Sequence, residues 1–269
     1  MNSIPSLFQS DRREFFLNRA AKNFKSHDFL YVWTASELKS RLSEIKREFK
    51  SVLICGLHTA DYFQDIFPHA VILKNTTPEI LEGHTGLYDC IISIGEMHCM
   101  NDLPGVLIQL RRALKPDGVM ILAFAGGETL HELRVSMMQS EMNIKGGASP
   151  RVYPFIDKQQ MAGLMQRAGF SLPVVDSEIL TVSYRDMFHL LSDVRGMGES
   201  NSLSDCHPKF TSSEIFFKAS QIYQDNFKED DGRVTASFEI VFSIGWSPHD
   251  SQQKPAKRGS GQVSLTEIL

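Results

Sequence analysis

The sequence predicts an α/β protein that is built on a largely parallel sheet. Short, continuously apolar runs recur along the middle of the chain, which is typical of strands that are buried on both faces. Segments with apolar residues at helical spacing separate these runs, and Gly and Pro residues mark many of the boundaries. This strand–helix alternation favours right-handed crossovers within one sheet.

The composition agrees with a folded chain that carries a large core. Hydrophobic residues make up 42% and charged residues 22% of the 269 positions, which excludes a wholly disordered or coiled-coil protein. The formal net charge of −4 gives no global attraction for nucleic acid, so we expect no nucleic-acid partner. The four cysteines are scattered and form no CxxC pair, which is typical of reduced thiols in a cytosol-like compartment.

Neither a secretory signal nor a membrane-spanning segment is evident. The first residues lack a long apolar stretch, and no run approaches the roughly 20 apolar residues that cross a bilayer. We therefore expect a cytoplasmic protein, with peripheral contact at an inner membrane left open.

The first half of the chain supplies most of the parallel strands. A helix over 36–49 is expected first, with Ser36 as its N-cap. A later helix begins after Asp102, a residue type that caps helix N-termini. The predicted strands of this half are residues 51–56, 70–74, 88–94 and 119–125.

The second half adds helices and antiparallel-type strands. Thr129 and Glu132 have the spacing of a capping box at the start of a helix. Residues 178–184 and the alternating run 238–246 are the predicted strands. We divide the chain into a helical N-terminal segment 1–50, an α/β domain 51–247 with a helical insertion at about 186–228, and an irregular tail 248–269.

Six short motifs stand out along the chain: HCMNDLP (98–104), LKPDG (114–118), GGETLHELR (126–134), GASP (147–150), GMGESN (196–201) and IGW (244–246). Together they resemble those of class I S-adenosylmethionine-dependent methyltransferases. The resemblance is particularly clear to the bacterial relatives of the mitochondrial complex I assembly factor of methyltransferase fold, which are similar to the biotin-pathway malonyl-carrier-protein methyltransferase. It runs from about Leu7 to Leu265.

The resemblance implies a Rossmann-like methyltransferase sheet with flanking helices. It also implies a role in respiratory complex I maturation, which in the mitochondrial relative proceeds through hydroxylation of an arginine on a partner subunit. The cofactor would bind at the carboxyl ends of the first strands, in a crevice lined by Gly56, Lys74 and His98.

The cofactor motif departs from the family pattern at several positions. The family reads roughly VLDxGxGxG, whereas residues 52–60 read VLICGLHTA and keep the first glycine. Ile54 has no side-chain acceptor, and the Cβ atoms of His58 and Ala60 restrict close backbone approach. Lys74 stands near the position where the ribose needs a carboxylate.

Spacing gives a second departure. The 13 residues between Lys74 and Tyr88 are too few for a helix, a strand and two loops. We therefore expect one βα unit to be missing between these two residues, and with it a wall of the adenine site. S-adenosylmethionine is a possible but doubtful cofactor.

Other candidate residues lie in the motifs that persist. Glu128 and Arg134 flank the helix expected near the crevice, where they are candidates for a partner or substrate surface or for a local cap and ion pair. Glu199 and Asn201 are expected to face solvent from a Gly-rich loop, where they are candidates for a lid or a partner surface; the alternative is that the glycines only end a helix. His98 is a candidate acid, base or recognition donor, or a packed core histidine. The scattered His and Cys residues show no metal-ligand spacing, so we expect no metal.

The leading hypothesis is a methyltransferase-like protein with a degenerate S-adenosylmethionine site that binds a partner protein in respiratory complex I assembly. The alternative is an active S-adenosylmethionine-dependent methyltransferase or protein-arginine hydroxylase with a rearranged pocket. A third hypothesis is a sensor that binds another small molecule in the crevice. The catalytic residues of an enzyme, the partner and the oligomeric state are not identified by the sequence.

Overall fold

The computed structural model describes residues 6–205 and 211–254. In these ranges the strands form one six-stranded sheet of order β2-β1-β3-β4-β6-β5. Strands β1 to β4 are parallel, and β6 is antiparallel to both β4 and β5. The strands are β1 (Val52–Cys55), β2 (Val71–Leu73), β3 (Tyr88–Ile94), β4 (Leu114–Ala125), β5 (Ser171–Tyr184) and β6 (Val234–Trp246). The predicted Rossmann-like α/β class is confirmed.

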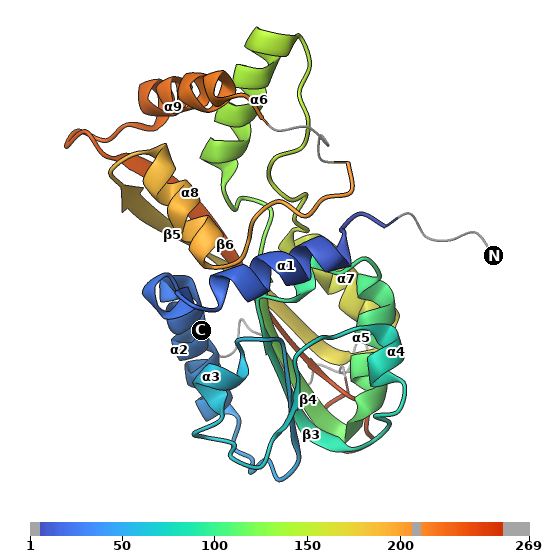
Figure 1. Ribbon diagram of the computed structural model, residues 1–269. Helices are drawn as coiled ribbons and strands as arrows, with labels where there is room; N and C mark the ends of the chain where they lie inside the picture. The colour runs from blue at the N-terminus through green and yellow to red at the C-terminus, as the bar shows by residue number, and fades with distance from the viewer. Residues whose placement is uncertain (1–5, 206–210, 255–269) are drawn as a thin grey trace, which may run out of the picture.

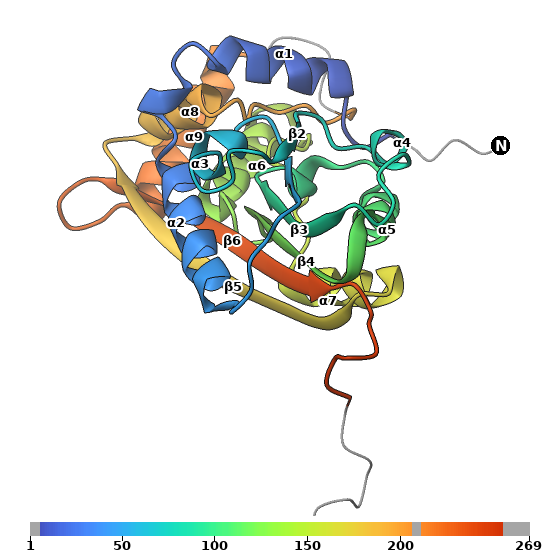
Figure 2. The same cartoon turned by 90° about the horizontal axis from the view of Figure 1, so that it is seen from below.

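Helices cover both faces of the sheet and extend it on one side. Helix α2 lies on one face, and helices α5 and α7 lie on the other (Figure 2). Helices α6, α8 and α9 pack with the far ends of β5 and β6 as a separate layer, which we call the upper layer (Figure 1). The helices are α1 (Ser10–Ala20), α2 (Phe29–Glu44), α3 (Ala60–Phe63), α4 (Pro78–Leu81), α5 (Leu103–Ala113), α6 (His131–Lys145), α7 (Lys158–Ala168), α8 (Met187–Gly196) and α9 (Ser213–Phe227), with short 3₁₀ turns η1 (Phe24–Ser26) and η2 (Met97–Cys99).

The parallel strands form the centre of the core because their side chains are apolar on both faces. Residues of β3 and β4 such as Ile91, Ile92, Ile121 and Leu122 are fully buried. Each buried side chain of this size contributes about 1.5–3 kcal/mol relative to an exposed one. This core fixes the carboxyl ends of β1, β3 and β4, which together form the floor of the candidate site.

The expected loss of one βα unit is confirmed. Between Lys74 and Tyr88 the chain forms the short helix α4 and no further strand. Strand β2 is therefore an edge strand, which pairs with β1 alone. The expectation that its run is buried on both faces is wrong, because Val71 is 44% and Ile72 36% exposed on this open edge.

Two local expectations are also corrected. Helix α2 begins before Ser36, because the buried face that includes Leu30 and Tyr31 extends the helix upstream. Thr129 and Glu132 do not cap helix α6. The Thr129 hydroxyl donates to the Glu239 carbonyl, and Glu132 accepts hydrogen bonds from Ser237, so both bind strand β6 instead.

The helical segments expected at the N-terminus and between β5 and β6 are present as α1 and α2 and as α8 and α9. Most of the expected irregular tail, from residue 255 on, lies outside the described residues. No helix in the described parts of the chain is long and apolar enough to cross a bilayer.

Candidate functional site

The carboxyl ends of β1 and β3 meet at a crevice that the chain's own side chains occupy. Gly56 follows β1 with a φ of +107°, a conformation that glycine adopts readily. A Cβ atom built on Gly56 would lie 2.7 Å from Cγ of Glu96. Thr59 joins the two strand ends, since its hydroxyl donates to the Cys55 carbonyl at 2.7 Å and accepts from the Ile94 amide at 3.0 Å.

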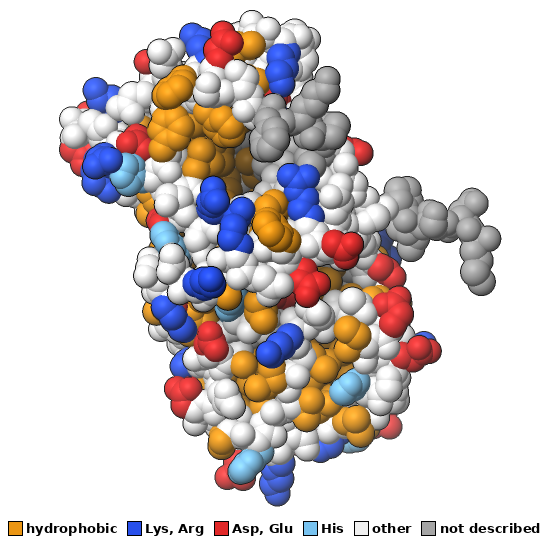
Figure 3. Space-filling model, in the orientation of Figure 1, with side chains coloured by type: hydrophobic (Ala, Val, Ile, Leu, Met, Phe, Trp, Pro, Cys, Tyr) orange, Lys and Arg blue, Asp and Glu red, His pale blue; other side chains and the backbone are white. Residues whose placement is uncertain are grey.

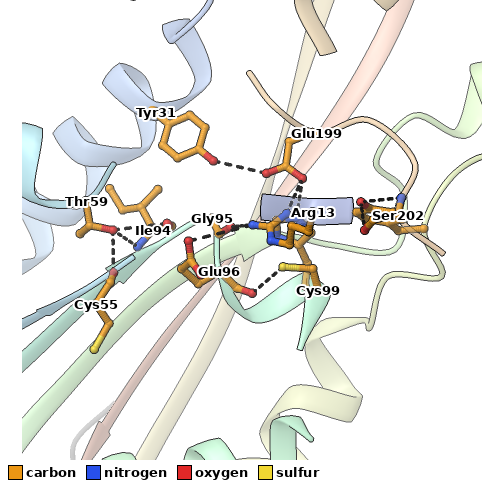
Figure 4. A network of polar contacts seen from close by, with 12 residues as sticks. Arg13, Tyr31, Cys55, Thr59, Ile94, Gly95, Glu96, Cys99, Glu199 and Ser202 are labelled. Atoms are coloured by element: carbon orange, nitrogen blue, oxygen red, sulfur yellow. Dashed lines mark hydrogen bonds and ion pairs between the residues drawn. The ribbon is translucent and has the colours of Figure 1, made fainter. Parts of the chain in front are cut away.

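A guanidinium from helix α1 lies at the centre of this crevice (Figure 4). Arg13 donates to the Gly95 carbonyl and to Oε2 of Glu199, each at 3.3 Å. Its Nη2 atom also lies 4.0 Å from Oε1 of Glu96. The hydroxyl of Tyr31 lies 3.5 Å from Oε1 of Glu199.

His98 completes this set of contacts, which we call the Arg13 network: Arg13, Tyr31, Glu96, His98 and Glu199. Its Nε2 atom lies 3.0 Å from Oε2 of Glu199. The residues come from α1, α2, the end of β3, η2 and the loop after α8. The partly buried carboxylate of Glu199 therefore joins segments that are far apart in the sequence.

The electrostatics of the network favour an ionised Glu199. Burial alone would raise the pKa of Glu199, but the charges of Arg13 and His98 and their hydrogen bonds lower it to about 2. Burial opposes the charge of Arg13 as well, yet its surroundings, including Glu199 and Glu96, raise its pKa. Burial raises the pKa of Glu96, against the effect of Arg13. The attraction between Arg13 and Glu199 thus offsets the cost of burying each charge.

Aromatic side chains fill the space beside the network. The rings of Phe24 and His58 stack with centroids 3.6 Å apart. Burial lowers the pKa of His58, with Asp61 acting in the opposite direction. Tyr31 covers Gly95 so closely that a Cβ atom there would lie 2.6 Å from the tyrosine oxygen.

These residues do not fit S-adenosylmethionine in the position that the fold normally provides. The glycine turn at Gly56 faces the side chain of Glu96 rather than open space. The guanidinium of Arg13 already occupies the space beside the Gly95 carbonyl. Lys74 is exposed after the edge strand and adds a positive charge where a ribose requires an acceptor. We therefore derive no chemical step through this cofactor.

A cavity of about 500 Å³ opens next to the filled crevice, between the sheet and the upper layer. Its floor includes Gly95, Ala123 and Ala125 at the carboxyl ends of β3 and β4, and its far wall includes Leu133 and Met137 of α6. This volume is in the range of sites that hold drug-sized ligands. The cavity, rather than the crevice, is the open site at this end of the sheet.

The structure brings some predicted site residues together and separates others. His98, Glu199 and Asn201 line the cavity, whereas Gly56 and Lys74 do not. The expectation that Glu199 faces solvent is wrong, because Arg13 and His98 hold it inward. Asn201 is partly buried and donates to the Pro150 carbonyl at 2.9 Å, so its amide joins the loop after α8 to the segment between α6 and α7.

The other two candidates have local contacts. Arg134 donates to the carbonyls of Gly127 and Thr129, each at 3.2 Å, and so supports the loop before α6. The Glu128 side chain is exposed outside the cavity, and its backbone amide donates to Glu239. These contacts agree with the alternative of a local structural role for both residues.

Sequence patterns alone do not point to four residues of the site: Arg13, Tyr31, Glu96 and Tyr153. Arg13 shares the buried face of α1 with Phe16 and Ala20, and an arginine on such a face is a signal for a buried partner. The Tyr153 hydroxyl lies 2.7 Å from Oγ of Ser202 and so fixes the loop after α8. No group of three or more metal-ligating side chains occurs among the described residues.

Comparison with known proteins identifies the family of the chain. A methyltransferase-domain model matches residues 18–173. The chain belongs to the methyltransferase-domain family. It is 40% identical to the mitochondrial arginine-hydroxylase NDUFAF5 of Danio rerio, over 90% of this chain and 82% of that protein. The mouse protein of the same name is 34% identical, over 94% of this chain and 82% of its own length. The predicted resemblance to this group of proteins is confirmed.

A solved structure supports the fold. A methyltransferase-type protein from Bacillus halodurans superimposes with a TM-score of 0.51 at 14% sequence identity, covering 80% of this chain and 99% of its own. At this identity the likeness concerns the fold alone. The function therefore has to be argued from the site.

Proposed function

We propose that this methyltransferase-fold protein is a partner-binding factor in the assembly of respiratory complex I, the NADH dehydrogenase. It acts at the cytoplasmic face of a bacterial inner membrane and does not use S-adenosylmethionine in the usual crevice. The observation that carries the proposal is the contrast between two adjacent spaces. The Arg13 network fills the cofactor crevice, whereas the neighbouring cavity is open.

The persisting motifs support this reading. In GMGESN, Glu199 holds helix α1 through Arg13, and Ser200 accepts a hydrogen bond from Arg19 at 2.9 Å. The motif therefore shapes one side of the cavity without any cofactor. In GGETLHELR, Arg134 and Thr129 fix the loop at the cavity wall. Both motifs maintain the surface that a partner would meet.

The test is a gene deletion in a host that naturally carries this chain and complex I. The proposal predicts that deletion lowers the amount of fully assembled complex I on native gels, and that the wild-type gene restores it. A variant with a blocked cavity mouth, Leu191→Trp, should restore less than the matched control Arg167→Ala, which changes an exposed residue on α7. Normal complex I in the deletion strain would refute the proposal.

Protein-arginine hydroxylation is the second candidate function. It is favoured by the name of the arginine-hydroxylase relatives and by the His98 Nδ1 atom, which is buried without a hydrogen-bond partner in the described structure. When Nε2 carries the proton that binds Glu199, Nδ1 is an acceptor suited to an N–H of a guanidinium. Mass spectrometry of complex I subunits from wild-type and deletion strains tests this. An arginine that carries one extra oxygen in the wild type alone would support the enzyme.

An active S-adenosylmethionine-dependent methyltransferase is the third candidate function, because the chain belongs to the methyltransferase-domain family. That function requires a pocket rearranged around the Arg13 network. Binding of the cofactor to the purified protein decides this point directly.

A further inference from the structure

The cavity has an apolar interior. Leu130, Leu133 and Met137 line it from α6 and the residue before α6, and Phe238 and Ile240 line it from β6. These side chains are all buried within the fold. Figure 3 shows the hollow on this face, with hydrophobic side chains gathered along its upper edge. A ligand that enters the hollow therefore exchanges water for apolar contacts.

The charged groups at the cavity are predominantly cationic. Among the described residues, Arg12, Arg151 and Arg195 line it, against one lining carboxylate, that of Glu199. That carboxylate is already bound to Arg13 and His98. Arg195 is therefore a lining cation that this carboxylate does not neutralise.

Arg195 and the neighbouring Arg19 provide positive charge at the cavity. Among the described residues, neither Arg19 nor Arg195 forms an ion pair with a carboxylate. Burial and then repulsion from Arg195 lower the pKa of Arg19. Arg19 is placed at the cavity by its hydrogen bond to Ser200, which is a lining residue. Arg151 differs, because Glu141 pairs with it.

We propose that the cavity binds an amphipathic anion, with an apolar chain in the interior and a carboxylate or phosphate head group at Arg195 and its neighbouring arginines. The volume of about 500 Å³ suits one such molecule. A sulfonium or ammonium head group would meet like charge at the mouth, and a fully polar anion would leave the apolar walls without contacts. This site is independent of the proposed function, since it needs no partner protein.

Calorimetry on the full chain tests the head group. Decanoate, decanol and decylamine share a chain and differ in charge, so decanoate should bind at least tenfold tighter than either analogue. Arg195→Gln should weaken decanoate binding about tenfold, whereas Arg167→Gln on α7 should leave it unchanged. Equal affinity for decanoate and decanol, or no effect of Arg195→Gln, would overturn the proposal.

The chain and its source are tested separately. From octanoate to dodecanoate the affinity should rise about fourfold for each added CH₂, because each buried methylene contributes about 0.8 kcal/mol. Leu191→Trp should abolish this increase while the melting temperature shows that the variant is folded. Absence of chain-length dependence in the wild type would contradict an apolar interior.

Vesicles distinguish a free acid from a lipid head group as the source of the anion. If the anion comes from a membrane lipid, the protein should bind phosphatidylglycerol vesicles but not phosphatidylcholine vesicles. Both Arg195→Gln and Leu191→Trp should then abolish the binding. Binding of soluble decanoate without vesicle binding would assign a free amphipathic acid. If neither ligand binds in a manner that depends on these two residues, the proposal is wrong.

Discussion

Replacing Glu199 with glutamine tests the buried network at its centre. The substitution keeps the shape of the side chain but removes the charge that Arg13 and His98 contact at 3.3 and 3.0 Å. The Arg13 guanidinium would then be left with the Gly95 carbonyl and with Glu96 at 4.0 Å. A buried cation that loses its counter-ion in this way is strongly destabilising.

The magnitude follows from the pKa of Glu199. Its pKa is about 2 in the fold, against about 4.3 in an unfolded chain. At 1.36 kcal/mol per unit, this difference corresponds to about 3 kcal/mol of stability at pH 7. Because the pKa is lowered, the stabilisation is present above about pH 4.3 and is lost as the pH falls through about 2. At pH 3 about half of it should remain.

Urea unfolding followed by fluorescence of Trp33 and Trp246 measures the effect. We expect Glu199→Gln to lower the free energy of unfolding by about 3 kcal/mol at pH 7, and by about half as much at pH 3. Glu44→Gln, on the exposed end of α2, is the control and should change stability by less than about 0.5 kcal/mol. A loss below 0.5 kcal/mol for Glu199→Gln, or a loss that does not change with pH, would refute the reasoning.

Three further predictions concern other parts of the fold. Gly95→Ala should lower the free energy of unfolding in urea by more than about 2 kcal/mol, since Gly95 has a φ of +72° and the Tyr31 hydroxyl oxygen would lie 2.6 Å from the new Cβ. Gly83→Ala, where the new Cβ meets open space, should be near neutral, and equal effects of the two substitutions would contradict this. Asn101→Ala should speed proteolysis within the first ten residues, because the Asn101 amide binds both backbone groups of Phe8; an unchanged cleavage rate would count against this clamp. In a Cys206→Ser background, alkylation should be slow until unfolding, since the remaining cysteines are buried and burial raises the pKa of Cys55 to about 12; rapid native labelling would show that they are accessible.

The fold could be predicted because its signals are local and repeated. The apolar runs of β1 and β3 and the Asp102 cap of α5 each depend on a few neighbouring residues. The missing βα unit could be predicted as well, since the 13 residues between Lys74 and Tyr88 are too few to form one. The capping box at Thr129 failed because strand β6, more than 100 positions away in the sequence, supplies competing hydrogen-bond partners.

The site was predicted less well, since its parts come from distant segments. His98 is expected at the carboxyl end of β3, and it lines the cavity there. Asn201 is expected to face solvent, but it is partly buried in the cavity lining. The inward direction of Glu199 depends on Arg13, which lies 186 residues away, and no local pattern encodes that pairing. The filled crevice could be inferred only in part, from the substitutions in the glycine-rich turn.

Titration of the purified full chain with S-adenosylmethionine and S-adenosylhomocysteine tests the central claim that the crevice is filled. The account predicts no saturable heat at millimolar ligand and no rise in melting temperature, from a sample that unfolds cooperatively. Saturable binding at micromolar concentration would contradict it. The Arg13 network would then have to give way to the cofactor, and the enzyme function would take precedence.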